Sequence, residues 1–189
     1  MKKIILYAIL ALVSLQGFAA EYKASLFGIK SNGAIDNTAS IQRAIDFISD
    51  EGGGTLVFSV GRYLTGAVIL KSNVSIILKE GAVIVGTSNI YGYGGHKAVF
   101  NAEGQENITI SGKGVIDGCG AELRAFMEKQ KSKGYLQKDF EVPSLMYFKD
   151  CRKIVLKDFI MRNPGTAPSL YVSVNSEVKE DGCYSDTKN

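Results

Sequence analysis

The sequence predicts an all-β fold, a right-handed parallel β-helix (a solenoid) with an amino-terminal capping α-helix. Three observations predict it: one short amphipathic segment near the start, a run of short β-branched segments after it, and the return of related segments further along the chain. Short strands that recur at irregular intervals of tens of residues are typical of a solenoid, in which each coil is stable only when stacked on its neighbours.

The capping helix is predicted over residues 38–50. Asp36, Asn37 and Thr38 offer side-chain oxygens to the free amides of a helix start. One apolar face follows at the spacing i, i+3, i+4, i+7, formed by Ile41, Ala44, Ile45 and Ile48. The glycines at 52–54 end the helix, because glycine enters the left-handed conformation without a Cβ clash. We therefore expect a helix of about 12 residues, buried on one side.

Short strands are predicted after the helix, separated by Gly or Asn. The first four are Thr55–Phe58, Ala67–Leu70, Val74–Leu78 and Ala82–Val85. The pattern then returns: Asn73–Ile76 reappears as Asn107–Ile110 and, more loosely, as Lys153–Leu156, while Gly81–Ile84 has an echo in Gly114–Gly118. Between the repeats, Ala121–Gly134 carries apolar residues among charges and predicts an inserted helix that packs on the coil.

The chain is predicted to contain a signal peptide over residues 1–20, a β-helix domain over 21–174 that is incomplete at its carboxyl-terminal end, and a polar tail over 175–189. Lys2 and Lys3 precede an apolar run that is too short for a lasting membrane anchor, and small residues follow it. This predicts a secreted or periplasmic protein. Without those two lysines the basic and acidic residues nearly balance, which excludes electrostatic recognition of nucleic acid.

Several strings resemble the amino-terminal region of polygalacturonase-like proteins, glycoside hydrolase family 28, within the pectin-lyase-like superfamily. They are Phe27–Lys30, Asp36–Ile45, Gly52–Val57, Gly61–Gly66, Leu70–Val74, Gly114–Gly118, Pro143–Leu145 with Cys151, and Arg162–Pro164. The resemblance covers residues 26 to 172 and implies a parallel β-helix related to enzymes that hydrolyse galacturonan-type polysaccharide.

The family's catalytic motifs are not found in this chain, so we assign no catalytic residue. The family uses an Asn-Thr-Asp-like motif, an Asp-Asp pair, a His-Gly and an Arg-x-Lys; this chain has no Asp-Asp pair, and His96 lies far upstream of any such position. The one local imitation, Glu180–Gly182, is interpreted as a chance turn in a polar tail. Asp117 is interpreted as a side-chain-to-backbone turn rather than as a catalytic acid.

Two hypotheses remain open. The first is a polygalacturonase-like chain that is inactive alone because it lacks catalytic coils; the second is a non-catalytic β-helix that binds polysaccharide or a partner chain. For binding, the candidates are Tyr91, Tyr93 and His96 in a Gly-rich loop, where a tyrosine ring could stack on a sugar. No metal site or cofactor is predicted, since one histidine and no Cys-x-x-Cys offer no ligand set.

The cysteines and the end of the coil carry the remaining expectations. Cys119, Cys151 and Cys183 either form one disulfide between stacked coils or stay as buried thiols. The last apolar segment, Ser169–Val174, is expected to leave an uncovered edge, because the polar residues after it lack the pattern of another strand. Such an edge predicts self-association of the protein.

Overall fold

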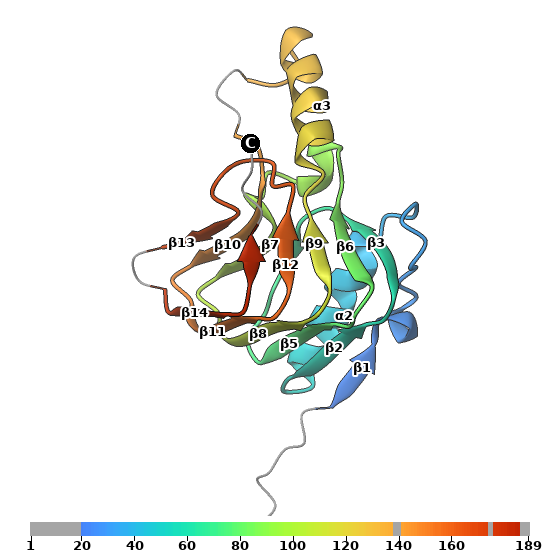
Figure 1. Cartoon of the computed structure of the whole chain (residues 1–189), viewed down its shortest axis with the longest axis vertical. Helices are drawn as coiled ribbons and strands as arrows, with labels where there is room; N and C mark the ends of the chain where they lie inside the picture. The colour runs from blue at the N-terminus through green and yellow to red at the C-terminus, as the bar shows by residue number, and fades with distance from the viewer. Residues whose placement is uncertain (1–19, 138–140, 174–175, 186–189) are drawn as a thin grey trace, which may run out of the picture.

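The structure, a computed structural model, describes residues 20–137, 141–173 and 176–185. The predicted signal peptide lies outside these residues, except for Ala20. All strand pairs are parallel and form three sheets, here called A, B and C, that wind around one core (Figure 1). The predicted parallel β-helix is therefore confirmed. Among the described residues, no helix is long and apolar enough to span a bilayer.

Each coil passes from sheet A to sheet B to sheet C. Sheet A contains β1 (Glu21–Lys23), β2 (Gly54–Phe58), β5 (Val74–Leu78), β8 (Glu106–Gly112), β11 (Arg152–Lys157) and β14 (Val178–Asp181). Sheet B contains β3 (Gly61–Thr65), β6 (Ala82–Gly86), β9 (Val115–Asp117), β12 (Ile160–Arg162) and β15 (Tyr184–Ser185). Sheet C contains β4 (Val68–Ile69), β7 (Ala98–Glu103), β10 (Ser144–Lys149) and β13 (Leu170–Val172).

The core is made of inward columns, in which residues from successive coils stack on one another. In sheet A, Leu56, Ile76, Ile110 and Leu156 are successive register partners, and all are fully buried. In sheet C, Phe100 and Met146 form a comparable pair. Successive strands lie about 4.8 Å apart, so like apolar side chains stack on one another, and each coil buries its apolar surface against the next coil.

The repeats read from the sequence are pairing partners in space. Thr109 pairs with Ser75 on one side and with Val155 on the other, so the first predicted motif stacks in the expected register. The second repeat is shifted by one residue from the expectation, because Ile84 pairs with Ile116 rather than with Asp117. This register places both isoleucines in the core, where each is fully buried.

Helix α2 (Thr38–Asp50) caps the amino-terminal end, and its predicted apolar face is fully buried. The expectation that Asn37 caps this helix through its side chain is wrong. Asp36 accepts the hydrogen bond of the Thr38 amide instead, whereas the buried Asn37 side chain bonds the backbone of Lys30, Ile35 and Leu64. Asn37 thereby fixes the loop that leads into the helix against sheet B.

The expectation that the polar tail lacks strands is wrong. Val178–Asp181 pairs with β11 as β14, and Tyr184–Ser185 pairs with β12 as β15. Parallel pairing is carried by backbone groups, so a polar segment can join the ladder when the coil below it presents free partners. The sequence analysis also missed β3, β7, β10 and β12, which mix polar and apolar residues or are only three residues long.

Candidate functional site

The long loops of the solenoid all leave at the corner between sheets B and C. Residues 87–97 contain the 3-10 helix η2 (Ile90–Tyr93), residues 118–143 contain α3 (Gly120–Ser132), and residues 163–169 form a loop with a cis bond before Pro168. The corner between sheets A and B has turns of two to three residues, such as 113–114 and 158–159. Figure 1 shows α3 rising from this corner, away from the coils. Insertions at one corner build a surface that the coils alone do not have.

A pocket of about 770 Å³ lies where these loops meet the outer face of sheet C. Its lining includes Gly95, His96, Lys97, Gln137, Glu141, Val142, Pro143, Ser144, Tyr147, Thr166, Ala167, Pro168 and Tyr171. Each of the three long loops contributes, and β10 and β13 supply the floor. It is larger than a second pocket of about 150 Å³ beside β2 and β3.

Two tyrosines on adjacent strands dominate the apolar part of the pocket. Tyr147 and Tyr171 are register partners, and their rings stack with centroids 4.7 Å apart and planes 8° from parallel. Each ring therefore covers one face of the other. Tyr171 lies on β13, the edge strand of sheet C, and is 45% exposed. The outer face of Tyr171 is the aromatic surface open to a ligand.

The charged groups of the pocket form one exposed ion pair. Lys97 Nζ donates a hydrogen bond to Glu141 Oε2 at 3.0 Å, and this bond, together with the carboxylate charge, raises the pKa of Lys97. Both side chains are more than half exposed, so the pair contributes little to stability and can exchange partners with a charged ligand. Lys97 thus offers a cation in the same pocket as Tyr171.

The structure separates the three binding candidates predicted from sequence. His96 lines the pocket. Tyr93 is 2% exposed and belongs to the core, where burial raises its pKa, so its ring cannot stack on a surface ligand. Tyr91 is exposed, but its ring packs edge-on against Phe126 of α3, and its hydroxyl donates a hydrogen bond to Gln130 Oε1 at 3.4 Å. A tyrosine in a Gly-rich loop is therefore not by itself a sign of binding.

Sequence reasoning missed Tyr147 and Tyr171. Their common signal is an outward position on strands one coil apart, and it can be read only once the pairing between β10 and β13 is known.

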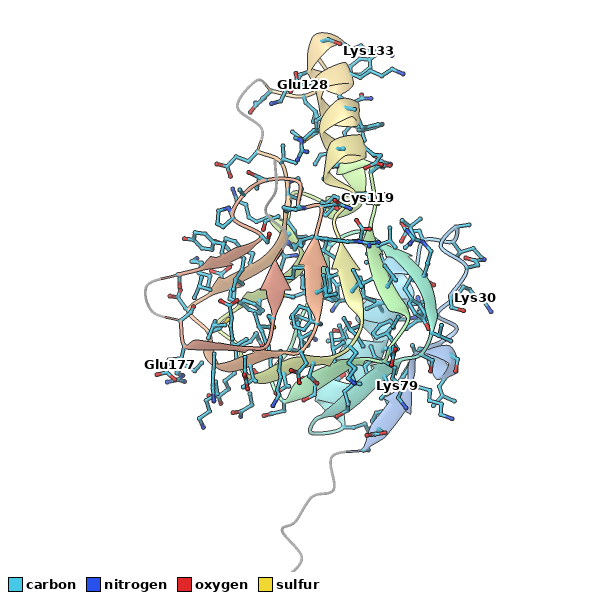
Figure 2. All side chains as sticks on the ribbon, viewed as in Figure 1. Lys30, Lys79, Cys119, Glu128, Lys133 and Glu177 are labelled. Atoms are coloured by element: carbon cyan, nitrogen blue, oxygen red, sulfur yellow. The ribbon has the colours of Figure 1, made fainter. Side chains whose placement is uncertain are left out.

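The predicted inserted helix is confirmed: α3 buries Leu123 and Met127, while Figure 2 shows Glu128 and Lys133 pointing away from the solenoid.

The acids considered from sequence have structural partners. Asp117 is nearly buried and accepts hydrogen bonds from the Cys119 amide, which confirms the turn interpretation, and from Arg162 and Asn163 of the next coil. Asp181 forms an ion pair with Lys157, with 3.5 Å between Asp181 Oδ2 and Lys157 Nζ. Among the described residues, no cluster of three His, Cys, Asp or Glu side chains could hold a metal ion.

The geometry defines a class of protein, a parallel β-helix whose long loops and larger described pocket lie at one corner. No family model matches the sequence. A curated relative, an exo-poly-alpha-D-galacturonosidase from Dickeya chrysanthemi, is 31% identical over 114 residues, which cover 50% of this chain and 19% of the relative. The chain thus spans about a fifth of that relative's length.

Solved structures give the family. A protein from Parabacteroides merdae, provisionally described as a glycosyl hydrolase, is 35% identical and superimposes with a TM-score of 0.78 over 90% of this chain and 87% of its own. The family 28 exopolygalacturonase of Yersinia enterocolitica has a TM-score of 0.70 at 23% identity, over 87% of this chain and 38% of its own. The chain belongs to the glycosyl hydrolase family that the Parabacteroides merdae protein represents, and it shares the fold of exopolygalacturonases of which it spans less than half the length.

Proposed function

We propose that this chain binds a segment of galacturonan-type polysaccharide in the pocket on sheet C. The observation that carries the proposal is one pocket that holds both the exposed ring of Tyr171 and the ammonium group of Lys97, at the corner where all the long loops converge. A sugar ring stacks on a flat aromatic face, and a uronate carboxylate pairs with an ammonium group. The galacturonosidase relative supplies the substrate class.

We further propose that the chain binds this polymer without hydrolysing it. Inverting hydrolysis needs a protonated carboxyl and a second carboxylate about 6.5–9.5 Å away. Among the described lining residues Glu141 is the one carboxylate, and it is paired with Lys97. Export by the predicted signal peptide would place the protein where such a polymer is found, and sequencing the amino terminus of exported protein tests cleavage near residue 20.

Calorimetric titration with a galacturonate oligosaccharide tests the binding proposal. We expect binding that the neutral galactose oligosaccharide of equal length does not show, and a Tyr171→Ala variant that binds about tenfold more weakly. Tyr135→Ala is the matched control, because Tyr135 is 67% exposed and lies outside the pocket lining. Equal affinity for the neutral sugar, or equal loss in both variants, would refute the site. Release of reducing ends above a buffer blank would refute the absence of hydrolysis.

A second proposal concerns the uncovered edge of sheet C. The edge strand β13 leaves Tyr171 and Val172 partly exposed, and edges of this kind pair with other chains. We propose that the isolated protein self-associates through β13. Sedimentation should show a larger species that a Val172→Lys variant loses; a wild-type protein that stays monomeric at high concentration would overturn this proposal.

A further inference from the structure

The loop over residues 163–169 forms one wall of the pocket, through Thr166, Ala167 and Pro168. It connects β12 to β13 and therefore also sets where the edge strand with Tyr171 begins. Three separate anchors hold this loop, at its start, its middle and its end.

The start of the loop is held by Asp117. Its carboxylate accepts hydrogen bonds from Arg162 Nε at 2.9 Å and from Asn163 Nδ2 at 3.1 Å. The Gly120 amide donates to the carbonyl of Asn163 at 2.9 Å. A Cβ at Gly120 would lie 2.0 Å from the carbonyl oxygen of Pro164, so the loop backbone approaches the start of α3 as closely as a glycine allows.

The end of the loop is held by Ser144 of β10. Its hydroxyl lies 3.0 Å from the carbonyl oxygen of Pro168 and 2.7 Å from that of Ser169. Ser144 also lines the pocket, so the floor and this end of the wall are joined directly.

The middle of the loop is held by a residue from the inserted helix. Arg124 Nη1 donates to the carbonyl oxygens of Pro164 at 3.0 Å and of Gly165 at 2.8 Å. A charged donor that bridges two carbonyls of one turn is stronger than a neutral hydrogen bond and fixes the turn in one shape. Gly165 is tightly packed as well, since a Cβ there would lie 2.2 Å from the carbonyl oxygen of Pro143.

We propose that Arg124 is a positioning residue of the binding pocket: it couples α3 to the 163–169 wall and thereby sets the width of the pocket and the place of Tyr171. Arg124 is not among the residues that line the pocket, so it acts through the loop. The ligand part of this inference rests on the proposed function. The part that concerns the loop does not.

Hydrogen exchange of the loop amides at residues 165–167 tests the coupling without any ligand. In an Arg124→Met variant, which keeps the aliphatic stem but removes the donors, we expect these amides to exchange about tenfold faster. Arg124→Lys, with a single charged donor, should restore part of the protection. Lys131→Met is the matched control, because Lys131 lies on the last turn of the same helix. Unchanged exchange in Arg124→Met, or an equal change in the control, would overturn the coupling.

Titration with the galacturonate oligosaccharide then tests the consequence for the pocket. We expect several-fold weaker binding in Arg124→Met, partial rescue in Arg124→Lys, and an unchanged melting temperature in both. Faster exchange with unchanged affinity would overturn the positioning role. If the wild-type protein does not bind the oligosaccharide, the proposed function fails, and the exchange measurement alone decides the coupling.

Discussion

At the scale of single residues, the coil corners depend on a left-handed conformation. Asn73, Asn107 and Lys153 occupy equivalent corner positions and have φ angles of 64°, 57° and 54°. Asparagine tolerates this region because its side chain can bond locally, and Asn107 Nδ2 donates to Asn73 Oδ1 at 3.0 Å. Lysine has no such compensation, so Lys153 is the strained member of the column.

A Lys153→Asn substitution should therefore stabilise the protein. We expect a gain of about 0.5–1 kcal/mol in the free energy of unfolding, because asparagine removes most of the left-handed penalty. Urea unfolding measures it. Lys30→Asn is the control, since Lys30 is exposed and its φ angle is not positive. A loss of stability in Lys153→Asn would show that the corner tolerates lysine without strain.

The three cysteines of the chain are free thiols in the structure. Of the two expectations, the disulfide is wrong, and burial is complete for Cys151 alone. Burial raises the pKa of Cys119 and of Cys183, so less thiolate is present at neutral pH than in an ordinary thiol.

The rate of alkylation should follow the thiolate fraction of these cysteines. Iodoacetamide should modify folded protein slowly at neutral pH and faster as the pH rises toward the elevated pKa values. Unfolded, unreduced protein should take up three adducts, counted by mass spectrometry. A single adduct would reveal a disulfide.

At the scale of elements, helix α2 closes the amino-terminal end through apolar packing and through side-chain hydrogen bonds to the backbone of the first coil. The buried face of α2 covers the first coil, and Gln42 bonds both the amide and the carbonyl of Ile69 on β4. Thr38 Oγ1 accepts the hydrogen bond of the Gly66 amide. The helix thus satisfies backbone groups that a bare coil end would leave unpaired.

Truncation of the buried face should be costly. Ile45 is fully buried, and Ile45→Ala should lower the free energy of unfolding by about 3 kcal/mol, from lost burial and a residual cavity. Arg43→Ala, on the exposed side of α2, should change it by less than about 0.5 kcal/mol. Comparable losses in the two variants would mean that α2 is not a packed cap.

At the scale of the whole molecule, the two ends of the solenoid differ in what opposes pairing with other chains: α2 covers the amino-terminal end, and no helix plays this part at the other end of the described residues. At the carboxyl-terminal end of sheet A, Glu180 is the register partner of the buried Leu156, so it stands at the end of the inward column, where its side chain is exposed. An inward charge at a coil end opposes the addition of a further strand, because that strand would have to bury the carboxylate. Sheet A is protected in this way, whereas the β13 edge of sheet C carries apolar residues.

Replacing the inward charge should remove the protection. We expect Glu180→Leu to raise self-association, seen as greater light scattering at equal concentration, because the column then presents an apolar surface. Lys179→Leu adds the same apolar side chain at the neighbouring position, which alternates to the outer face of the strand, and is the control. Equal scattering from the two variants would show that inward placement of the charge does not matter.

The sequence by itself determined what depends on local pattern. The period of Ile41–Ile48 fixed the buried face of α2, Asn at the corners fixed the turns, and the recurrence of Asn73–Ile76 identified the stacking coils. These features report short-range conformational preferences and periodic burial, which a chain carries in its own order of residues.

Only the tertiary structure decided the site. His96, Tyr147 and Tyr171 come from three coils, and they meet because every long insertion leaves at one corner and because β13 pairs with β10 in one register. The same packing buried Tyr93 and drew polar residues 178–181 into a strand. Contacts between coils depend on the pairing register and on the path of the loops, and neither can be predicted from the sequence of a single segment.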